Sequence, residues 1–337
     1  MAKSNLALVE ETDRLPYLQA SRETSTECDS SRGMYTFVWQ DERGSYPIGY
    51  VVDRVIGELR KVPADIRGPL HVDRTCRTIS LFQLPTEPER SALVANLVSY
   101  WRQHETFDLL KGWRDELWPV FSRDGEVLFS IERAAMGLLG TVRYGVHLTA
   151  FVTAPSAPYG LLIWVPKRAA SKSTFPGMLD NTVAGGLTTG EQPLECIIRE
   201  AEEEASLPEK LVREKAKNVG TVTYAYITEK ETAGDSGFIY PECQWVYDLN
   251  LPHDVVPHPK DGEVERFDLC DVNQVKRDLA DGKFKNNCAV VMLDFLIRHK
   301  IITASNEPHF HTICRRMHRK LPFPGPHHAG WCSPWVA

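Results

Sequence analysis

The chain has 337 residues, of which 42% are hydrophobic and 25% are charged. This composition is typical of a folded globular protein, and the length suggests two domains, or one domain with a large extension. The formal net charge of −6 argues against a general nucleic-acid binder or a protein held on anionic membranes, because either would need basic surface to neutralise phosphates.

The first residues lack both the charged start and apolar core of a signal peptide and the Arg-rich, acid-poor composition of a transit peptide. The longest apolar stretch, residues 289–297, is too short to cross a bilayer and contains Asp294. The eight cysteines form no CxxC pair, which favours buried thiols in a reducing compartment. We therefore expect a cytoplasmic protein without a membrane segment.

The first part of the chain divides into an arm and a small domain. Residues 1–34 are rich in Ser, Thr, Glu and Asp, and they contain too little apolar material to offset the entropy of ordering, so we expect a disordered N-terminal arm. Residues 35–138 mix strand and helix patterns, which predicts an α+β domain of unknown function. The expected strands are 35–39, 46–52 and 127–131, and the expected helices are 53–60 and 91–103.

The second part of the chain is denser in strands. Residues 145–153 and 160–166 are predicted to form a hairpin, because Pro and Gly residues separate them. Further strands are expected at 219–228, 243–249 and 264–269, and helices at 272–281 and 287–300. The pattern predicts an α/β fold over 139–305, with a mixed sheet covered by helices and preceded by the smaller α+β domain. Residues 306–337 are expected to form a C-terminal helix and tail.

Residues 185–207, GGLTTGEQPLECIIREAEEEASL, carry the strongest chemical signal in the chain. They are predicted to form a glycine loop followed by a helix, with Pro193 at the tolerated first turn. An apolar stripe at helical spacing would anchor this helix. Glu200, Glu203 and Glu204 are three and four residues apart, so their carboxylates converge on one side.

Such a cluster of acids repels itself unless a cation compensates for it. Several carboxylate oxygens suit Mg²⁺ or Mn²⁺, which share their ligand shell with waters and substrate phosphates. Arg199 can pair with a carboxylate, and Glu191 is the candidate. The alternative is a solvated acidic helix face, which is common for Glu-rich helices, but the preceding glycine loop disfavours it.

The spacing runs Gly185, five residues, Glu191, seven residues, then Arg199, Glu200, Glu203 and Glu204. It resembles the Nudix box, except that Ser206 stands where the family has a glycine. This departure affects the turn after the helix, where glycine eases a left-handed conformation. It removes no carboxylate, so metal binding is still expected.

The likeness extends beyond the box. Residues 175–187, the strand GTVTYAYI, residues 261–265 and the sequence RRMHRKLPFP are similar to the thiamine pyrophosphokinase-related Nudix proteins of fungi and plants. Residues 110–118 and 129–135 resemble the N-terminal domain of unknown function in those proteins. The resemblance implies an α/β/α sandwich for the second domain and hydrolysis of an organic diphosphate with Mg²⁺ or Mn²⁺.

The resemblance also assigns roles to residues. Arg199 would orient a ligand, Glu191 would brace Arg199, and one of the box glutamates could take a proton from the attacking water. Glu263, with Glu265 as the second choice, would supply a carboxylate from outside the box. The implied metal ligands are Glu200, Glu203, Glu204, Glu263 and a main-chain carbonyl at Ala184 or Gly185.

The substrate is expected to be a small-molecule diphosphate, and relatives of this type imply thiamine diphosphate or its oxidised analogues. ADP-ribose, a dinucleotide or an isoprenoid diphosphate, isomerisation in place of hydrolysis, and non-catalytic diphosphate sensing are the alternatives. The oligomeric state is not predicted. Trp118 could stack on a heterocycle, although a core position is favoured, and His147 is expected in the core. The predicted substrate-binding residues are Gly185, Gly186, Trp164, Lys167 and Arg168.

Overall fold

The computed structural model describes residues 2–17, 33–172, 174–229 and 235–328. The N-terminal domain contains a four-stranded sheet in the order β2-β1-β4-β3, in which β1 pairs antiparallel with β2 and parallel with β4. A separate antiparallel hairpin, β5–β6, follows the long helix α4. The elements are β1 (Met34–Asp41), β2 (Gly44–Val52), α2 (Asp53–Leu59), α3 (Ala64–Arg67), β3 (His71–Asp73), β4 (Thr78–Ser80), α4 (Glu87–Gln103), η3 (Asp108–Gly112), β5 (Leu117–Phe121), β6 (Val127–Glu132), η4 (Arg133–Ala135) and α5 (Met136–Leu139).

The second domain is built on a sheet with the order β10-β11-β7-β8-β12, and β9 pairs with β7. β11 is parallel to β7 and the other strand pairs are antiparallel, so the sheet is mixed. The predicted α/β fold with a preceding α+β domain is confirmed. The elements are β7 (Arg143–Thr153), η5 (Pro158–Gly160), β8 (Leu161–Arg168), β9 (Val183–Gly186), α6 (Pro193–Ala205), α7 (Glu209–Lys215), β10 (Lys217–Ile227), β11 (Ile239–Asn250), β12 (Val264–Asp271), α9 (Val272–Ala280), α10 (Asn286–Arg298) and α11 (Phe310–Met317).

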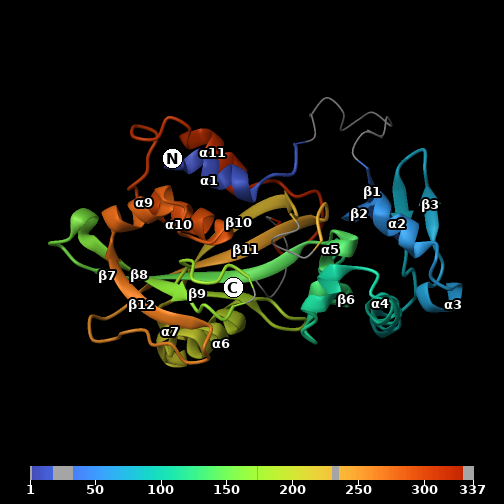
Figure 1. The fold of residues 1–337 in the computed structure, drawn as a ribbon, viewed down its shortest axis with the longest axis horizontal. Helices are drawn as coiled ribbons and strands as arrows, with labels where there is room; N and C mark the ends of the chain where they lie inside the picture. Colours follow the sequence, from blue (N-terminus) through green and yellow to red (C-terminus); the bar gives the residue numbers. More distant parts are fainter. Residues whose placement is uncertain (1, 18–32, 173, 230–234, 329–337) are drawn as a thin grey trace.

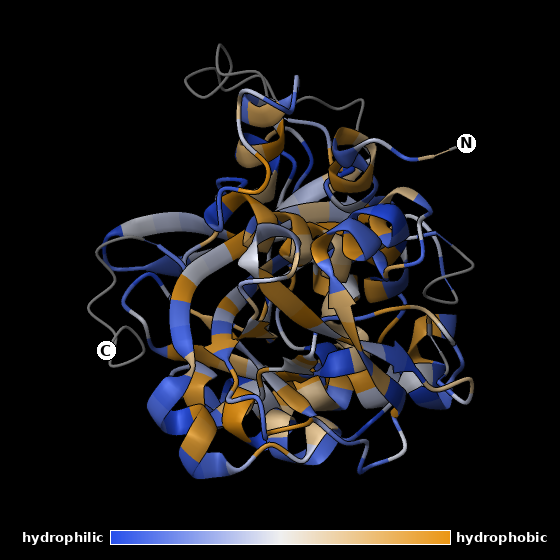
Figure 2. Ribbon diagram, turned by 90° about the vertical axis from the view of Figure 1, so that its left-hand side faces the viewer, coloured by the Kyte–Doolittle hydropathy of each residue, from blue (hydrophilic) through white to orange (hydrophobic). Residues whose placement is uncertain are grey.

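Helices cover both faces of this sheet, α6 and α7 on one and α1, α9, α10 and α11 on the other (Figure 1). Successive strand residues point to opposite faces. In β11, Trp245 therefore joins the core under α6, whereas Val246 joins the core under α10. In Figure 2 the hydrophobic residues follow the strands and the helix sides that face them. Burial of these two apolar layers is the main stabilising contribution to the domain.

The N-terminal segment differs from the expected disordered arm. Residues Asn5–Thr12 form α1, whose Leu8 and Val9 are buried in the core with α10 and α11. Asp13 is fully buried, where its Oδ1 accepts from Arg319 Nη1 at 2.8 Å and from the main-chain N of Ala225 at 3.1 Å. The prediction was wrong here because the apolar partners come from the far end of the chain. Residues 18–32 of the expected arm, and 329–337 of the expected tail, lie outside the described residues.

Candidate active site

β7 places the glycine loop next to the acidic helix, because both pack against this strand. β9, which the sequence pattern did not predict, pairs antiparallel with β7 and places Gly186 opposite Gly145. α6 then starts at Pro193 and buries its apolar stripe in the core that it shares with β7 and β11. Burial of the stripe therefore determines which side of α6 faces the loop, and the β7–β9 pairing determines where the loop lies along the helix. The buried residues of the stripe are Cys196, Ile197, Ile198, Ala201 and Ala205.

Glu200 and Glu204 occupy the side of α6 that faces the glycine loop. Glu204 is only 9% exposed, and its Oε2 accepts from the main-chain N of Ala184 at 3.0 Å. Glu200 lies so close to Gly185 that a Cβ on this glycine would stand 2.2 Å from the carboxyl carbon. Burial raises the pKa of Glu200 to about 7 and that of Glu204 well above its usual range. The loop thus needs glycine at 185 to admit the carboxylate.

Arg199 ties the acids of the box together. Its Nε and Nη2 donate to both oxygens of Glu191 at 2.8 and 3.1 Å, which is the predicted pair in bidentate form. Its Nη1 donates to Glu200 at 2.9 Å and to Glu203 at 3.0 Å. Glu203 is 46% exposed, unlike its two neighbours in the box. One guanidinium therefore offsets part of the repulsion among three carboxylates.

Glu200, Glu204 and the main chain of the glycine loop meet at one place, called here the acidic corner. Its oxygen atoms are of the kind that bind a divalent cation. The buried carboxylate of Glu204 and the largely covered carboxylate of Glu200 meet the main chain of Ala184 and Gly185. Burial raises the pKa of both groups, and at Glu200 it outweighs the opposing effect of Arg199. In the described ranges, no three His, Cys, Asp or Glu side chains already surround a common point. Mg²⁺ does not require that, since it is commonly held by one or two carboxylates together with waters and phosphates. Glu203 could contribute only from the exposed side.

Of the two candidates from outside the box, Glu265 lies on β12, the strand next to β8, and Glu263 directly precedes this strand. Glu263 is close enough to Glu204 to raise its pKa by repulsion, and it forms an ion pair with Lys172. Glu265 pairs with Lys167 and with Arg266. The structure thus brings Glu263 toward the acidic corner, and a role as a further metal ligand stays a prediction.

Three predicted substrate-binding residues are placed differently from the prediction. Arg168 Nη1 donates to the buried Asp180 at 2.7 Å, and its other nitrogens donate to main-chain oxygens of residues 174 and 175. Lys167 pairs with Glu265 across the β8–β12 ladder. Trp164 is 9% exposed and belongs to the core under α6. None of the three lines the cavity described below, because β12 covers the strand end that the sequence suggested would be open.

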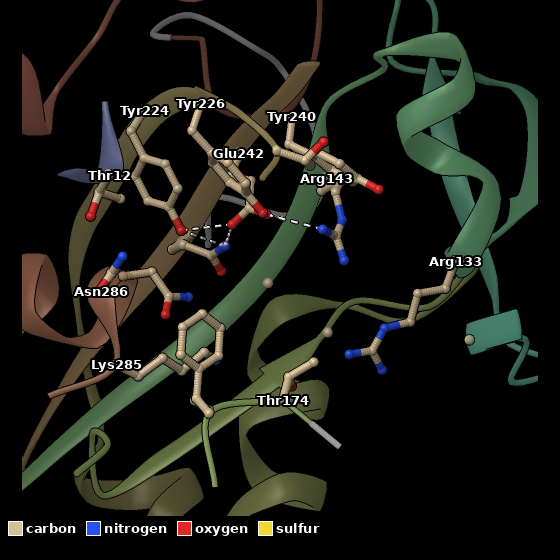
Figure 3. A pocket seen from close by; sticks show the side chains of 18 of the residues that line it. Thr12, Arg133, Arg143, Thr174, Tyr224, Tyr226, Tyr240, Glu242, Lys285 and Asn286 are labelled. Atoms are coloured by element: carbon tan, nitrogen blue, oxygen red, sulfur yellow. Dashed lines mark hydrogen bonds and ion pairs between the residues drawn. The ribbon is translucent and has the colours of Figure 1, made fainter. Parts of the chain in front are cut away.

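A cavity of about 770 Å³ opens between the two domains, with Ala184, Gly185 and Gly186 in its wall. Figure 3 shows Arg143, Glu242 and the tyrosines Tyr224, Tyr226 and Tyr240 on one side of it, and Arg133 on another. Sequence reasoning missed all of these except the glycines. The sequence gives only a weak indication that these residues line a site, because Arg133 and the β11 residues lie far from the box in the chain.

The polar residues in the cavity wall form a connected network. Glu242 is 7% exposed, and its oxygens accept from Tyr224 Oη at 2.6 Å and from Gln244 Nε2 at 3.0 Å. Arg143 Nη1 donates to the same carboxylate at 3.3 Å. His147, which also lines the cavity, is buried and bonded through Nδ1 to Asn181 Oδ1 at 2.8 Å. The expected core position of His147 is observed.

Ser206 stands at the position where the Nudix box has a glycine, and its conformation can be tested by substitution. It ends α6 in the left-handed region, with φ 53° and ψ 29°, and its Oγ donates to the main-chain oxygen of His258 at 3.0 Å. We expect Ser206→Gly to exceed Ser206→Ala in free energy of unfolding by about 1 kcal/mol, because both lose the hydroxyl and only Ala keeps the left-handed penalty. Urea unfolding of the two variants measures this difference. Equal stabilities would contradict the assigned conformation.

The part of the chain that the structure describes contains no helix long and apolar enough to cross a membrane. Two family models match the sequence, the NUDIX domain over residues 144–288 and the Domain of unknown function (DUF4743) over residues 18–143. The boundary between them falls at the start of β7. The two models therefore meet where the structure joins the α+β domain to the mixed sheet.

Curated relatives match this chain over most of its length. Over 282 residues, 82% of each protein, the chain is 36% identical to the Uncharacterized protein YJR142W of Saccharomyces cerevisiae. It is 38% identical to Nudix hydrolase 20, chloroplastic, and 37% identical to Nudix hydrolase 24, chloroplastic, both of Arabidopsis thaliana. These matches cover 68% and 62% of this chain but only 59% and 54% of the plant proteins. The chain belongs to the Nudix hydrolase family, with a DUF4743 domain before its NUDIX domain.

Proposed function

We propose that the protein hydrolyses a small organic diphosphate with the aid of Mg²⁺ or Mn²⁺, and that thiamine diphosphate or an oxidised analogue is its substrate. The observation that carries the reaction class is the pair of carboxylates, the buried Glu204 and the largely covered Glu200, that lies against the glycine loop, and this loop forms part of the wall of a large cavity. Such a pair can hold a cation at one end of a bound diphosphate.

A bound divalent cation would neutralise the diphosphate and activate a water as the nucleophile. Glu200 and Glu204 would hold it, with Glu203, Glu263 and the Ala184 carbonyl as further candidates. Side chains of the protein would orient the ligands and accept the proton. Arg199, fixed by its two bonds to Glu191, orients Glu200. One of the box glutamates would take the proton from the attacking water.

Support for a heterocyclic substrate comes from the far wall of the cavity. Tyr226 and Tyr240 stack at 5.4 Å between ring centres, and the buried Glu242 lies beside them. Arg143 already pairs with Glu242 and lies over Tyr240, so the support comes from the aromatic rings in the cavity wall, which suit a flat heterocycle. The resemblance of the chain to thiamine pyrophosphokinase-related Nudix proteins adds a reason to test thiamine compounds first.

A substrate screen tests this proposal. Purified protein with Mg²⁺ or Mn²⁺ is expected to release phosphate from thiamine diphosphate or its oxidised analogues faster than from ADP-ribose, CoA or farnesyl diphosphate, and EDTA is expected to abolish the release. Chromatography identifies the monophosphate product. Turnover of another diphosphate with thiamine compounds left intact would refute the substrate and keep the reaction class. No metal-dependent turnover of any of them would contradict the reaction class for this set of substrates.

A further inference from the structure

Two arginines from different domains meet at one tryptophan in the cavity wall. The guanidinium carbons of Arg133 and Arg143 lie 5.2 and 5.1 Å from the ring centre of Trp118. Arg133 comes from η4 of the N-terminal domain, and Arg143 begins β7 of the NUDIX domain. Both side chains line the cavity (Figure 3).

The N-terminal domain reaches the glycine loop at the same place. A Cβ on Gly186 would stand 2.3 Å from Trp118, so the indole packs directly on the loop. The main-chain N of Thr189 donates to Leu117 O at 2.8 Å, and its hydroxyl donates to Ser130 Oγ at 3.0 Å. The β5–β6 hairpin therefore supports the loop that faces Glu200.

The backbone that carries Arg133 is fixed by buried groups. Glu132 is 4% exposed, and its Oε1 accepts from the main-chain N of Ala134 at 3.2 Å and of Arg114 at 3.1 Å. The N of Arg133 donates to Glu116 O at 2.9 Å. A guanidinium on so well-determined a segment is pre-organised, which reduces the entropy that ligand binding costs.

Arginines gather around Trp118. Burial lowers the pKa of Arg133, and repulsion from Arg143 and Arg114 lowers it further, so the three arginines lie close together. The ion-pair partners in the described part of the site are Glu116, 3.0 Å from Arg133, and Glu242, 3.3 Å from Arg143. Arg143 Nε and Trp118 Nε1 are buried without a hydrogen-bond partner among the described residues. Guanidinium groups that converge on one cavity wall suit an anion with several oxygens.

We propose that Arg133 and Arg143 bind the phosphates of the substrate, so that the DUF4743 domain supplies one side of the active site. This inference rests on the proposed function for the identity of the ligand as a diphosphate. Gly145, two residues after Arg143, pairs with Gly186 of the loop, which sets this anion site beside the corner that holds Glu200. A diphosphate bound there would have cations on both sides.

Binding of methylenediphosphonate, a diphosphate analogue that resists hydrolysis, tests the inference in the full-length protein by calorimetry. Arg133→Met is expected to raise the Kd roughly ten- to a hundredfold, the effect of losing a charge-assisted contact. Arg133→Lys, which keeps the charge but not the planar fork, should raise it less. Arg123→Met is the matched control, because Arg123 also pairs with a carboxylate, Asp41, and lies over an aromatic ring, Tyr46, but outside the cavity. The control should leave the Kd unchanged.

Glu116→Gln separates anion binding from a structural ion pair. If Arg133 binds phosphate, removing its carboxylate partner should leave the Kd equal or lower, opposite to Arg133→Met. If the Arg133–Glu116 pair only stabilises the N-terminal domain beside the glycine loop, both variants should weaken binding alike, and that result would overturn the inference.

The outcome for this site can be distinguished from the outcome for the reaction. Analogue binding that depends on Arg133, with no diphosphate turned over, would refute the proposed function and keep the anion site. Turnover and analogue binding that are both unchanged in Arg133→Met would keep the function and refute the anion site.

Discussion

Glu204→Gln is expected to lower turnover by at least a hundredfold while the protein stays folded. The carboxylate is buried beside Glu200, and a neutral amide cannot supply the charge that a divalent cation needs. The amide oxygen can still accept the hydrogen bond from the main-chain N of Ala184. Burial already raises the pKa of Glu204, so the neutral side chain should not destabilise the metal-free protein. Phosphate release and thermal unfolding measure the two effects.

Glu202→Gln is the matched control for this variant. It removes a carboxylate from the same helix, but Glu202 is exposed and pairs with Lys260 at the surface. Its turnover and its Mn²⁺ affinity, followed by titration, should equal those of the unaltered protein. Undiminished turnover in Glu204→Gln, or equal losses in both variants, would remove Glu204 from the metal site.

Local patterns predicted the elements of the site well. The apolar spacing of residues 194–205 predicts a helix with one buried face, and α6 buries Ile197, Ala201 and Ala205 as expected. The same spacing places Glu200 and Glu204 on a neighbouring face, and both lie against the glycine loop. These features depend on residues within one helical turn or one loop, so sequence alone determines them.

Features that depend on strand order and distant segments could not be predicted in this way. Lys167 and Arg168 are predicted to bind substrate, but β12, about a hundred residues later, pairs with β8 and supplies Glu265 to Lys167. Arg133 and Arg143 give no pattern in the sequence, and only the packing of the β5–β6 hairpin on the glycine loop brings them to one cavity. Long-range packing therefore decides which residues line the cavity that we propose binds the substrate.

Gly185→Ala is expected to lower turnover about a hundredfold through the position of Glu200, because misplacing a catalytic group by about 1 Å has effects of that size. The added Cβ would stand 2.2 Å from Cγ and Cδ of Glu200, so the carboxylate must move away from the loop. The backbone conformation itself allows alanine, since Gly185 is not among the positive-φ glycines of the described chain. Steady-state kinetics and Mn²⁺ titration measure the loss.

Gly57→Ala is the control for adding a methyl group, because Gly57 lies in α2 with no atom within 4 Å of the added carbon. It should keep full turnover and gain up to about 1 kcal/mol in free energy of unfolding, since alanine favours helices. The double variant Gly185→Ala with Glu200→Ala provides a further test: removal of both clashing carbons makes room for the methyl group, so Gly185→Ala should cost less in this background than in the unaltered protein. If Gly185→Ala keeps full turnover, or if the two changes multiply independently, Glu200 does not depend on the loop and the geometry assigned to the metal corner is wrong.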